Sequence, residues 1–329
     1  MPNQAELSPV RVQPVATGAV PAPRRTRSHT PPLRRPSIAE LLAEGGRPLF
    51  SFELFPAKDE VQERQLWQTV RELEALGPDF VSVTYGANGS SRDRTIRATE
   101  AIALHTTLRP MAHLTCASQS RAQLRQVVGS YAAAGIRHVL AIRGDMPGGP
   151  TVPWERHPEG LANATELVAL VRELGDFCIG VAAFPDLHPE RHDPDLDARV
   201  LVAKAEAGAS FAITQLFFTA DRYFDLVARV RDLGCDIPVI PGIMPVTRFS
   251  QIKRFAELSG AELPSSVTDR INVVADDEAQ VRAVGIDLAT ELSDQLLAGG
   301  APGLHFITMN RSPATREIYA RLRPGMRRG

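Results

Sequence analysis

From residue 37 onward the chain alternates between short apolar segments and longer amphipathic ones, and this alternation limits its fold more than any other feature. The short segments favour β-strands at 48–56, 79–86, 111–117, 138–145, 177–185, 211–218, 238–245 and 303–310. Apolar residues at helical spacing predict helices at 60–76, 92–107, 121–135, 163–175, 195–208, 221–234, 250–260, 278–300 and 314–322. Several strands are continuous apolar runs, which is typical of a parallel sheet buried on both faces.

Eight strands separated by helices predict an α/β fold, and their number fits a (β/α)8 TIM barrel. An open, doubly wound sheet is the alternative. That fold would carry a glycine-rich phosphate-binding motif after an early strand, and the chain has neither GxGxxG nor a Walker A motif. We therefore expect the closed barrel.

The first 36 residues differ from the rest of the chain in proline content and in charge. They hold eight of the 26 prolines, six arginines and one acidic residue, so their formal charge is +5 and that of 37–329 is −6. Few large apolar residues are available there to offset the entropy cost of ordering the chain. We expect a disordered Pro/Arg-rich tail at 1–36, either without chemistry or acting as an electrostatic tether, and one catalytic barrel domain at 37–329.

Composition narrows the classes of function. A net charge of −1 argues against a dedicated nucleic-acid binder, and no apolar run approaches the ~18 residues of a membrane span. The three cysteines lie far apart without a CxxC motif, which favours a reducing, cytoplasmic setting. His188 and His192 have i,i+4 spacing, but Pro189 interrupts any helix there and no third ligand completes a metal set, so we expect no metal.

Polar residues gather where the predicted strands end. In a barrel of this type the active site is built at the C-terminal ends of the strands and in the loops that follow. The polar or ionisable residues at these places are Glu53, Thr84, Tyr85, His113, Thr115, Arg143, Asp145, Asp186, His188, Thr214, Gln215, Thr308, Asn310 and Arg311. A barrel interior is otherwise mostly aliphatic, so this many polar residues at one end predict a binding or catalytic site.

Glu53 is the most informative of these residues because it lies between Phe52 and Leu54. An unpaired carboxylate in apolar surroundings has a raised pKa, which suits a general acid near neutral pH. The alternative is a salt bridge inside the barrel, for example to Arg143.

Asp145 and Gln215 each allow two interpretations. Asp145 follows Gly144, which would let the backbone approach a flat ligand, but an Asp there could also cap the next turn. Gln215 lies in an otherwise apolar strand, and a buried amide needs hydrogen-bond partners. Either a ligand or a polar group of a neighbouring strand would have to supply them.

Eight sequence blocks between about 48 and 322 resemble the bacterial methylenetetrahydrofolate reductase family, in order and most closely its actinobacterial branch. The blocks are SFELFP, VSVTYGANGSSRDRT, AHLTC, AIRGDMPGG, GVAAFPDLHPE, AGASFAITQLFF, PVIPGIMPVTRFSQIKRF and HFITMNRS. The resemblance implies a flavoenzyme in which NADH or NADPH reduces FAD. The reduced flavin then converts 5,10-methylenetetrahydrofolate to 5-methyltetrahydrofolate by a ping-pong mechanism, supplying methyl groups for methionine synthesis. It also implies a homo-oligomer.

The resemblance assigns roles to single residues. Glu53 matches the general acid that protonates the folate, and Asp145 matches the acidic residue beside the flavin and the pterin. The residues that match substrate-binding positions are Gln215, Gln251, Phe255 and Arg311. The residues that match FAD-binding positions are Thr84, Tyr85, Ala87, His113, Arg143, Gly144, Asp145, Ala164, Phe184, His188, Asp197 and Lys204.

Four positions depart from the family pattern. Val200 and Ala203 stand where family members commonly have Asn and Arg, Asn163 replaces an aromatic residue, and Phe184 replaces Tyr. These changes weaken the expected contacts to the ribityl, phosphate or adenine parts of FAD. A flavin-independent reductase of the same folate is therefore an alternative.

Two further alternatives come from different classes of protein. A barrel flavoenzyme that oxidises a cyclic amine such as proline would share FAD but would not need the RGD and HFITMNR blocks together. A non-catalytic folate-binding protein would tolerate the loss of Glu53. No dinucleotide motif separates NADH from NADPH as the electron donor.

Overall fold

A computed structural model describes residues 35–85 and 89–326 of the chain. The predicted tail at 1–36 lies outside these residues except for its last two, and the predicted FAD contact Ala87 also lies outside them.

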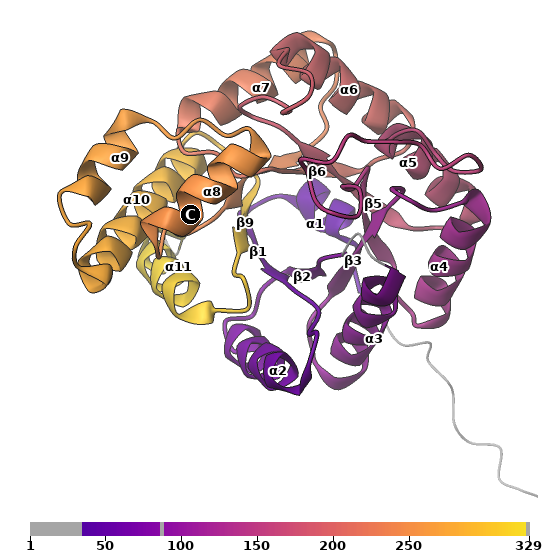
Figure 1. The fold of residues 1–329 in the computed structure, drawn as a ribbon, viewed down its shortest axis with the longest axis horizontal. Helices are drawn as coiled ribbons and strands as arrows, with labels where there is room; N and C mark the ends of the chain where they lie inside the picture. Colours follow the sequence, from indigo (N-terminus) through magenta and orange to yellow (C-terminus); the bar gives the residue numbers. More distant parts are fainter. Residues whose placement is uncertain (1–34, 86–88, 327–329) are drawn as a thin grey trace, which may run out of the picture. The chain divides into compact units, whose positions relative to one another are not determined.

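Parallel strands form a single closed ring with helices around it (Figure 1). The strands are β1 (Leu49–Leu54), β2 (Phe80–Val83), β3 (Pro110–Thr115), β4 (His138–Ile142), β5 (Cys178–Ala183), β6 (Phe211–Thr214), β7 (Val239–Ile240), β8 (Gly242–Ile243) and β9 (Gly303–Ile307). Their order around the ring is β7-β6-β5-β4-β3-β2-β1-β9-β8.

The ring closes through the seventh predicted strand, which Pro241 divides into β7 and β8. β7 pairs with β6, and β8 pairs with β9. Proline has no backbone N–H to donate to a neighbouring strand, but the carbonyl of Pro241 accepts the N–H of His305 at 2.9 Å. The prediction of a (β/α)8 barrel is confirmed, and the open-sheet alternative is wrong.

The described residues contain eleven helices, most of which lie outside the ring. They are α1 (Ile38–Glu44), α2 (Glu60–Glu74), α3 (Gly89–His105), α4 (Arg121–Ala133), α5 (Ala164–Leu174), α6 (Pro194–Glu206), α7 (Ala220–Asp232), α8 (Phe249–Ser259), α9 (Ser265–Asn272), α10 (Glu278–Ala298) and α11 (Ser312–Met326). None of them is long and apolar enough to cross a membrane. Helices α1 and α9 were not expected from the sequence.

Helix α1 covers the N-terminal end of the barrel (Figure 1). A capping box between Ser37 and Glu40 starts the helix. Its residue Ile38 is fully buried against Leu49 and the interior residues of the neighbouring strands, including Phe80 and Phe211. This apolar plug closes one end of the barrel, so polar chemistry is restricted to the other end.

The predicted strands are longer than the observed ones, chiefly at their C-terminal ends. The segment 138–145, for example, is a strand only over His138–Ile142. Residues beyond each end have left the sheet and form the loops at the open end of the barrel. The polar residues Thr84, Arg143 and Asp145 therefore lie in loops, where side chains are free to face a ligand.

Candidate active site

The carboxylate of Glu53 lies inside the barrel between two histidines. Its Oε2 is 3.7 Å from Nε2 of His113 on β3 and 3.8 Å from Nε2 of His305 on β9. The side chain is 15% exposed, so it is reachable from the open end. Of the two alternatives for Glu53, an unpaired carboxylate in apolar surroundings is wrong, and a salt bridge inside the barrel is closer to the structure. The partners are His113 and His305, whereas Arg143, the example partner, pairs with Glu190. Phe52 and Leu54 point to the opposite face of the strand, because side chains alternate along a strand.

His305 is fixed by contacts on both sides of its ring. Its Nδ1 is 2.7 Å from the hydroxyl of Ser51, and its Nε2 is 3.3 Å from the hydroxyl of Ser82. The ring of Phe80 stacks on it at 5.8 Å. We call Glu53, His113 and His305 the central carboxylate site. His305 was not singled out from the sequence, although an ionisable residue within the apolar run GLHFI was a signal.

The central carboxylate site shifts the pKa values of its members. Burial, the largest influence, raises the pKa of Glu53, but the contact with His305 and the charge of His113 outweigh it. The net pKa of Glu53 is therefore lower than usual. Burial lowers the pKa of His113 to about 4, although Glu53 opposes this shift. Around neutral pH the site thus holds an ionised carboxylate beside a neutral imidazole.

A strained turn after β9 ties the first and last strands together at the open end. Met309 and Asn310 both have positive φ angles, near 53° and 54°, which non-glycine residues rarely adopt. The side chain of Asn310 exchanges two hydrogen bonds with the backbone of Phe55, each 2.8 Å long. Thr308 donates to the carbonyl of Glu53 at 2.6 Å. Arg311 follows this turn, is exposed, and pairs with no carboxylate in the described parts of the chain.

The ends of β2 and β3 supply further predicted cofactor contacts. Thr84 lies directly after β2 and its N–H donates to Leu54 at 2.9 Å. The Tyr85 hydroxyl donates to Gln119 in the loop after β3 at 3.3 Å. Two buried atoms on β3, Nε2 of His113 and Oγ1 of Thr115, have no hydrogen-bond partner in the described residues.

The loop after β4 carries Arg143, Gly144 and Asp145. Arg143 forms a bidentate pair with Glu190, with both hydrogen bonds at 2.6 Å, and lies 5.2 Å from the ring centre of Trp154. Gly144 has a φ of +79°, and a Cβ there would overlap the Thr115 side chain at 2.5 Å. The backbone at Gly144 therefore lies close to β3, whereas the sequence had suggested a close approach to a ligand. Asp145 is exposed at the rim, and partial burial of its carboxyl group raises its pKa.

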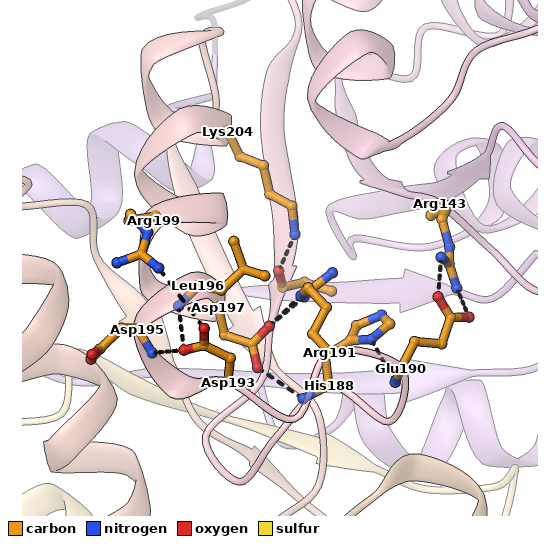
Figure 2. Close-up of polar contacts among 11 residues, drawn as sticks. Arg143, His188, Glu190, Arg191, Asp193, Asp195, Leu196, Asp197, Arg199 and Lys204 are labelled. Carbon is orange, nitrogen blue, oxygen red and sulfur yellow. Dashed lines mark hydrogen bonds and ion pairs between the residues drawn. The ribbon is translucent and has the colours of Figure 1, made fainter.

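The loop after β5 is held by the start of α6, as Figure 2 shows. Asp197 is 2% exposed at its side chain. Its carboxylate accepts the N–H of His188 at 2.8 Å and the guanidinium of Arg191 at 2.6 Å. Phe184 contacts the ring of His188 at 4.7 Å. Burial lowers the pKa of His188 to about 4.

Lys204 lies two helical turns after Asp197 on α6, and its Nζ donates to the carbonyl of Ala182 at 2.8 Å. Burial lowers the pKa of Lys204 to about 8. We call the group around the ends of β4 and β5 the cationic rim. Its members are Arg143, His188, Glu190, Arg191, Asp197 and Lys204 (Figure 2). The rim was expected from the sequence except for Glu190 and Arg191.

The remaining predicted residues lie on other elements of the open end. Ala164 is buried in the first turn of α5. Gln215 is half-buried after β6, and its side-chain oxygen accepts the neighbouring N–H of Leu216 at 2.9 Å. This partner is the following residue and not a neighbouring strand. Gln251 and Phe255 are both half-buried and lie one turn apart on α8, as expected.

Comparisons with known proteins agree with this arrangement. The family model described as methylenetetrahydrofolate reductase matches residues 38–323. The 5,10-methylenetetrahydrofolate reductases of Salmonella typhimurium and Escherichia coli are each 38% identical over 296 residues, covering 89% of this chain and 98% of theirs. The chain belongs to the methylenetetrahydrofolate reductase family. It is therefore an enzyme of the oxidoreductase class, from a family that acts on methylenetetrahydrofolate.

Two further relatives define the extent of the match. Methylenetetrahydrofolate reductase 1 of Schizosaccharomyces pombe is 34% identical over 83% of this chain, which spans 45% of the yeast protein. A solved structure shares the fold with a TM-score of 0.57 and 12% identity, covering 85% of this chain and 96% of the other. It is described as an uncharacterized protein from Clostridium thermocellum that binds two copies of 5-methyl-5,6,7,8-tetrahydrofolic acid.

Three buried polar atoms around the ends of β3 and β4 are left for a ligand to satisfy. Besides His113 and Thr115, the indole Nε1 of Trp154 is buried without a hydrogen-bond partner in the described residues. Buried polar groups are nearly always hydrogen-bonded in proteins. Thr115 lies against Gly144 and Trp154 lies beside Arg143, whereas Nε2 of His113 faces Glu53.

One departure from the family pattern has a local explanation. Asn163 is the N-cap of α5, and its side chain accepts the N–H of Glu166 at 3.0 Å. Asn is among the best N-cap residues, whereas an aromatic side chain cannot accept this bond. The change therefore stabilises the helix that carries Ala164.

Proposed function

We propose that the protein reduces 5,10-methylenetetrahydrofolate to 5-methyltetrahydrofolate with electrons from NADH or NADPH, through bound FAD. The observation that supports this most strongly is the central carboxylate site, which places one reachable, ionisable carboxylate in the open end of a barrel whose other end is plugged. Bound FAD would accept a hydride from the nicotinamide and donate it to the folate. The two substrates then take turns at one site, in a ping-pong sequence.

Glu53 is the acid that opens the folate ring. The free carboxylate has a lowered pKa, so it must gain a proton before it can donate one. A pterin that covers the 15% of the Glu53 side chain that is still exposed would bury the carboxyl further, and burial is the influence that raises its pKa. Substrate binding would then shift Glu53 toward its acid form, with the proton taken from solvent. His305, fixed by Ser51 and Ser82, keeps the carboxylate oriented toward the open end.

The other predicted residues hold ligands. His113, Thr115 and Gly144 would contact the flavin ring, and Asp145 would disfavour negative charge on the reduced ring and so favour hydride donation. The glutamate carboxylate of the folate would bind Arg311, whose exposed guanidinium is suited to a two-point contact. Gln215, Gln251 and Phe255 would hold whichever substrate is present.

Two observations support the ligand class and the setting. The Clostridium thermocellum protein that shares this fold is described as binding 5-methyl-5,6,7,8-tetrahydrofolic acid. The three cysteines are free thiols, which is compatible with a reducing cytoplasm.

The flavin-independent alternative has one feature in its favour, which is the loss of the family's polar and cationic residues at Val200 and Ala203. In that case NADH and the folate would have to bind together for direct hydride transfer. An enzyme that oxidises a cyclic amine would instead be reduced by proline and not by NADH.

The test follows the reduction by NADH and the reoxidation by the folate separately, in the absence of oxygen. The purified protein should show a flavin absorbance band, which NADH bleaches and which 5,10-methylenetetrahydrofolate restores with formation of 5-methyltetrahydrofolate. Colourless protein that still makes the product would contradict the role of FAD and favour direct transfer. Protein that stays inactive with added FAD would refute the proposed reaction, and bleaching by proline alone would favour the amine oxidase.

A further inference from the structure

The cationic rim carries one cation that the family resemblance did not supply. Arg191 lies in the turn between β5 and α6, where the family pattern assigned no cofactor contact. The side chain is 24% exposed, so part of the guanidinium faces solvent while the rest is in contact with the protein. Its charge is also among the influences that lower the pKa values of His188 and Lys204. Arg191 therefore lies within the predicted FAD site.

Arg191 is held in place before any ligand arrives. The backbone N–H groups of Arg191 and His192 both donate to the carbonyl of His188, at 3.0 and 3.1 Å. His192 adopts a positive φ of 51°, which closes this turn. The guanidinium donates through Nε to Asp197 at 2.6 Å and lies 5.9 Å from the ring centre of Phe184. A preorganised cation loses little entropy when it binds an anion.

The guanidinium keeps donors for a ligand. Its Nε and Nη2 face Asp197, whereas Nη1 makes no hydrogen bond or ion pair within the described residues. Arginine presents several N–H donors in a planar fork that matches phosphate oxygens. Both carboxylate oxygens of Asp197 already accept from Arg191 or His188. The predicted FAD contact Asp197 therefore acts by holding the turn and the arginine.

Arg191 also decides the charge balance at this end of the barrel. Arg143, Arg191 and Lys204 are countered by Asp145, Glu190 and Asp197, and His188 is neutral near pH 7 because its pKa is about 4. The charges of this group therefore sum to zero, in a body of the chain with net charge −6. Without Arg191 the group would be net negative and would repel a phosphate group.

We propose that Arg191 binds the diphosphate of FAD. The inference rests on the proposed use of FAD. The same chemistry would suit the diphosphate of NADH or NADPH, and the experiment separates these sources.

The test measures the dissociation constant of FAD from the full-length protein freed of flavin, by quenching of flavin fluorescence. Arg191→Ala should weaken FAD binding at least tenfold, which is about 1.4 kcal/mol, and should reduce the dependence of FAD binding on salt concentration. Riboflavin, which lacks the diphosphate, should bind both proteins equally. Arg199→Ala is the matched control, because Arg199 lies on α6, is 56% exposed and pairs with Asp193 at 3.9 Å (Figure 2).

Removing Arg191 also leaves Asp197 without its cation, and a bare carboxylate would repel phosphate. The double variant Arg191→Gln, Asp197→Asn removes both charges, and the single variant Asp197→Asn disturbs the same turn but keeps Arg191. FAD binding that is clearly weaker in the double variant than in Asp197→Asn supports direct contact by Arg191, and equal binding by the two variants overturns it.

Wild-type FAD affinity in Arg191→Ala would also overturn the inference. If the KM for NADH is raised in that variant, Arg191 would instead be assigned to the nicotinamide dinucleotide. Wild-type protein that binds no FAD at all would instead contradict the proposed function itself.

Discussion

The central carboxylate site and the cationic rim both gather charged groups at the open end of the barrel, but they hold them differently. In the centre, Glu53 lies 3.7 and 3.8 Å from two imidazole nitrogens, and burial keeps one of these rings, His113, neutral near pH 7. In the rim, Arg143 and Arg191 contact carboxylates at 2.6 Å through guanidinium groups that keep their charge at all relevant pH values. The centre is therefore suited to moving protons, and the rim is suited to holding an anion.

Glu53→Gln should have the largest effect and should separate the two regions. The amide keeps the size of the side chain but cannot deliver a proton, so folate reduction should fall by about 10²–10⁴-fold. Oxidation of NADH with a quinone acceptor should persist, because it needs no proton from Glu53. The measurement is the two steady-state rates on the same preparation. A folded variant that loses both rates would contradict the role given to Glu53.

Gly144→Ala should have the next largest effect, which is a loss of stability. A Cβ there meets the Thr115 side chain at 2.5 Å, and φ is +79°, so we expect a loss of about 2–4 kcal/mol in the free energy of unfolding. Gly135→Ala is the control, because Gly135 has a φ of +74° but nothing within 4 Å. That change should cost about 1 kcal/mol. Equal losses in urea titrations would show that contact with β3 does not constrain the rim.

The buried histidines should make stability depend on pH. His113 in the centre, His138 at the plugged end and His188 in the rim have pKa values lowered to about 4, chiefly by burial. The unfolded chain binds protons at these residues near pH 6.5, so the free energy of unfolding falls as pH drops from 6.5 to 4. Each histidine contributes up to ~1.4 kcal/mol per pH unit in that window.

His138→Gln should reduce this pH dependence by the contribution of one histidine, without affecting FAD binding or folate reduction, because His138 lies far from the open end. Urea titrations at pH 7 and pH 5 would measure the change. A variant that keeps the wild-type loss of stability between these two values would show that His138 is not buried in its neutral form.

Arg270→Ala should have the smallest effect. It tests whether a bidentate Arg–Glu pair outside the cationic rim contributes to FAD binding. Arg270 forms a bidentate pair with Glu291, at 2.6 and 3.0 Å, that resembles the Arg143–Glu190 pair but lies on exposed helices. Its loss should change the free energy of unfolding by less than about 1 kcal/mol and leave FAD affinity unchanged. Arg143→Ala should weaken FAD binding about tenfold. Equal effects of the two variants on FAD would remove the distinction.

The barrel could be predicted from the sequence because strand and helix periods alternate along the chain and can be read locally. Helix α1 could not, because seven residues are too few for a clear helical period. Its role depends on Ile38 meeting side chains from strands distant in sequence.

Most residues of the site could be predicted from the sequence, but the contacts between them could be predicted less well. Glu53 was identified correctly as lying inside the barrel, yet its environment was inferred from Phe52 and Leu54, which face away from it. Its actual neighbour His305 is brought close by the parallel register that places Ser51 opposite His305. The pairing of Arg143 with Glu190 likewise joins loops after two different strands, which no local pattern reveals.

The division between centre and rim is tested most directly by measuring folate reduction as a function of FAD concentration. Wild-type protein, Glu53→Gln and Arg191→Ala would be compared after removal of bound flavin. The account predicts that Glu53→Gln reaches half of its small maximal rate at the wild-type FAD concentration. Arg191→Ala should need at least tenfold more FAD but should then approach the wild-type rate. An Arg191→Ala protein that stays inactive at saturating FAD, or a Glu53→Gln protein with altered FAD dependence, would contradict it.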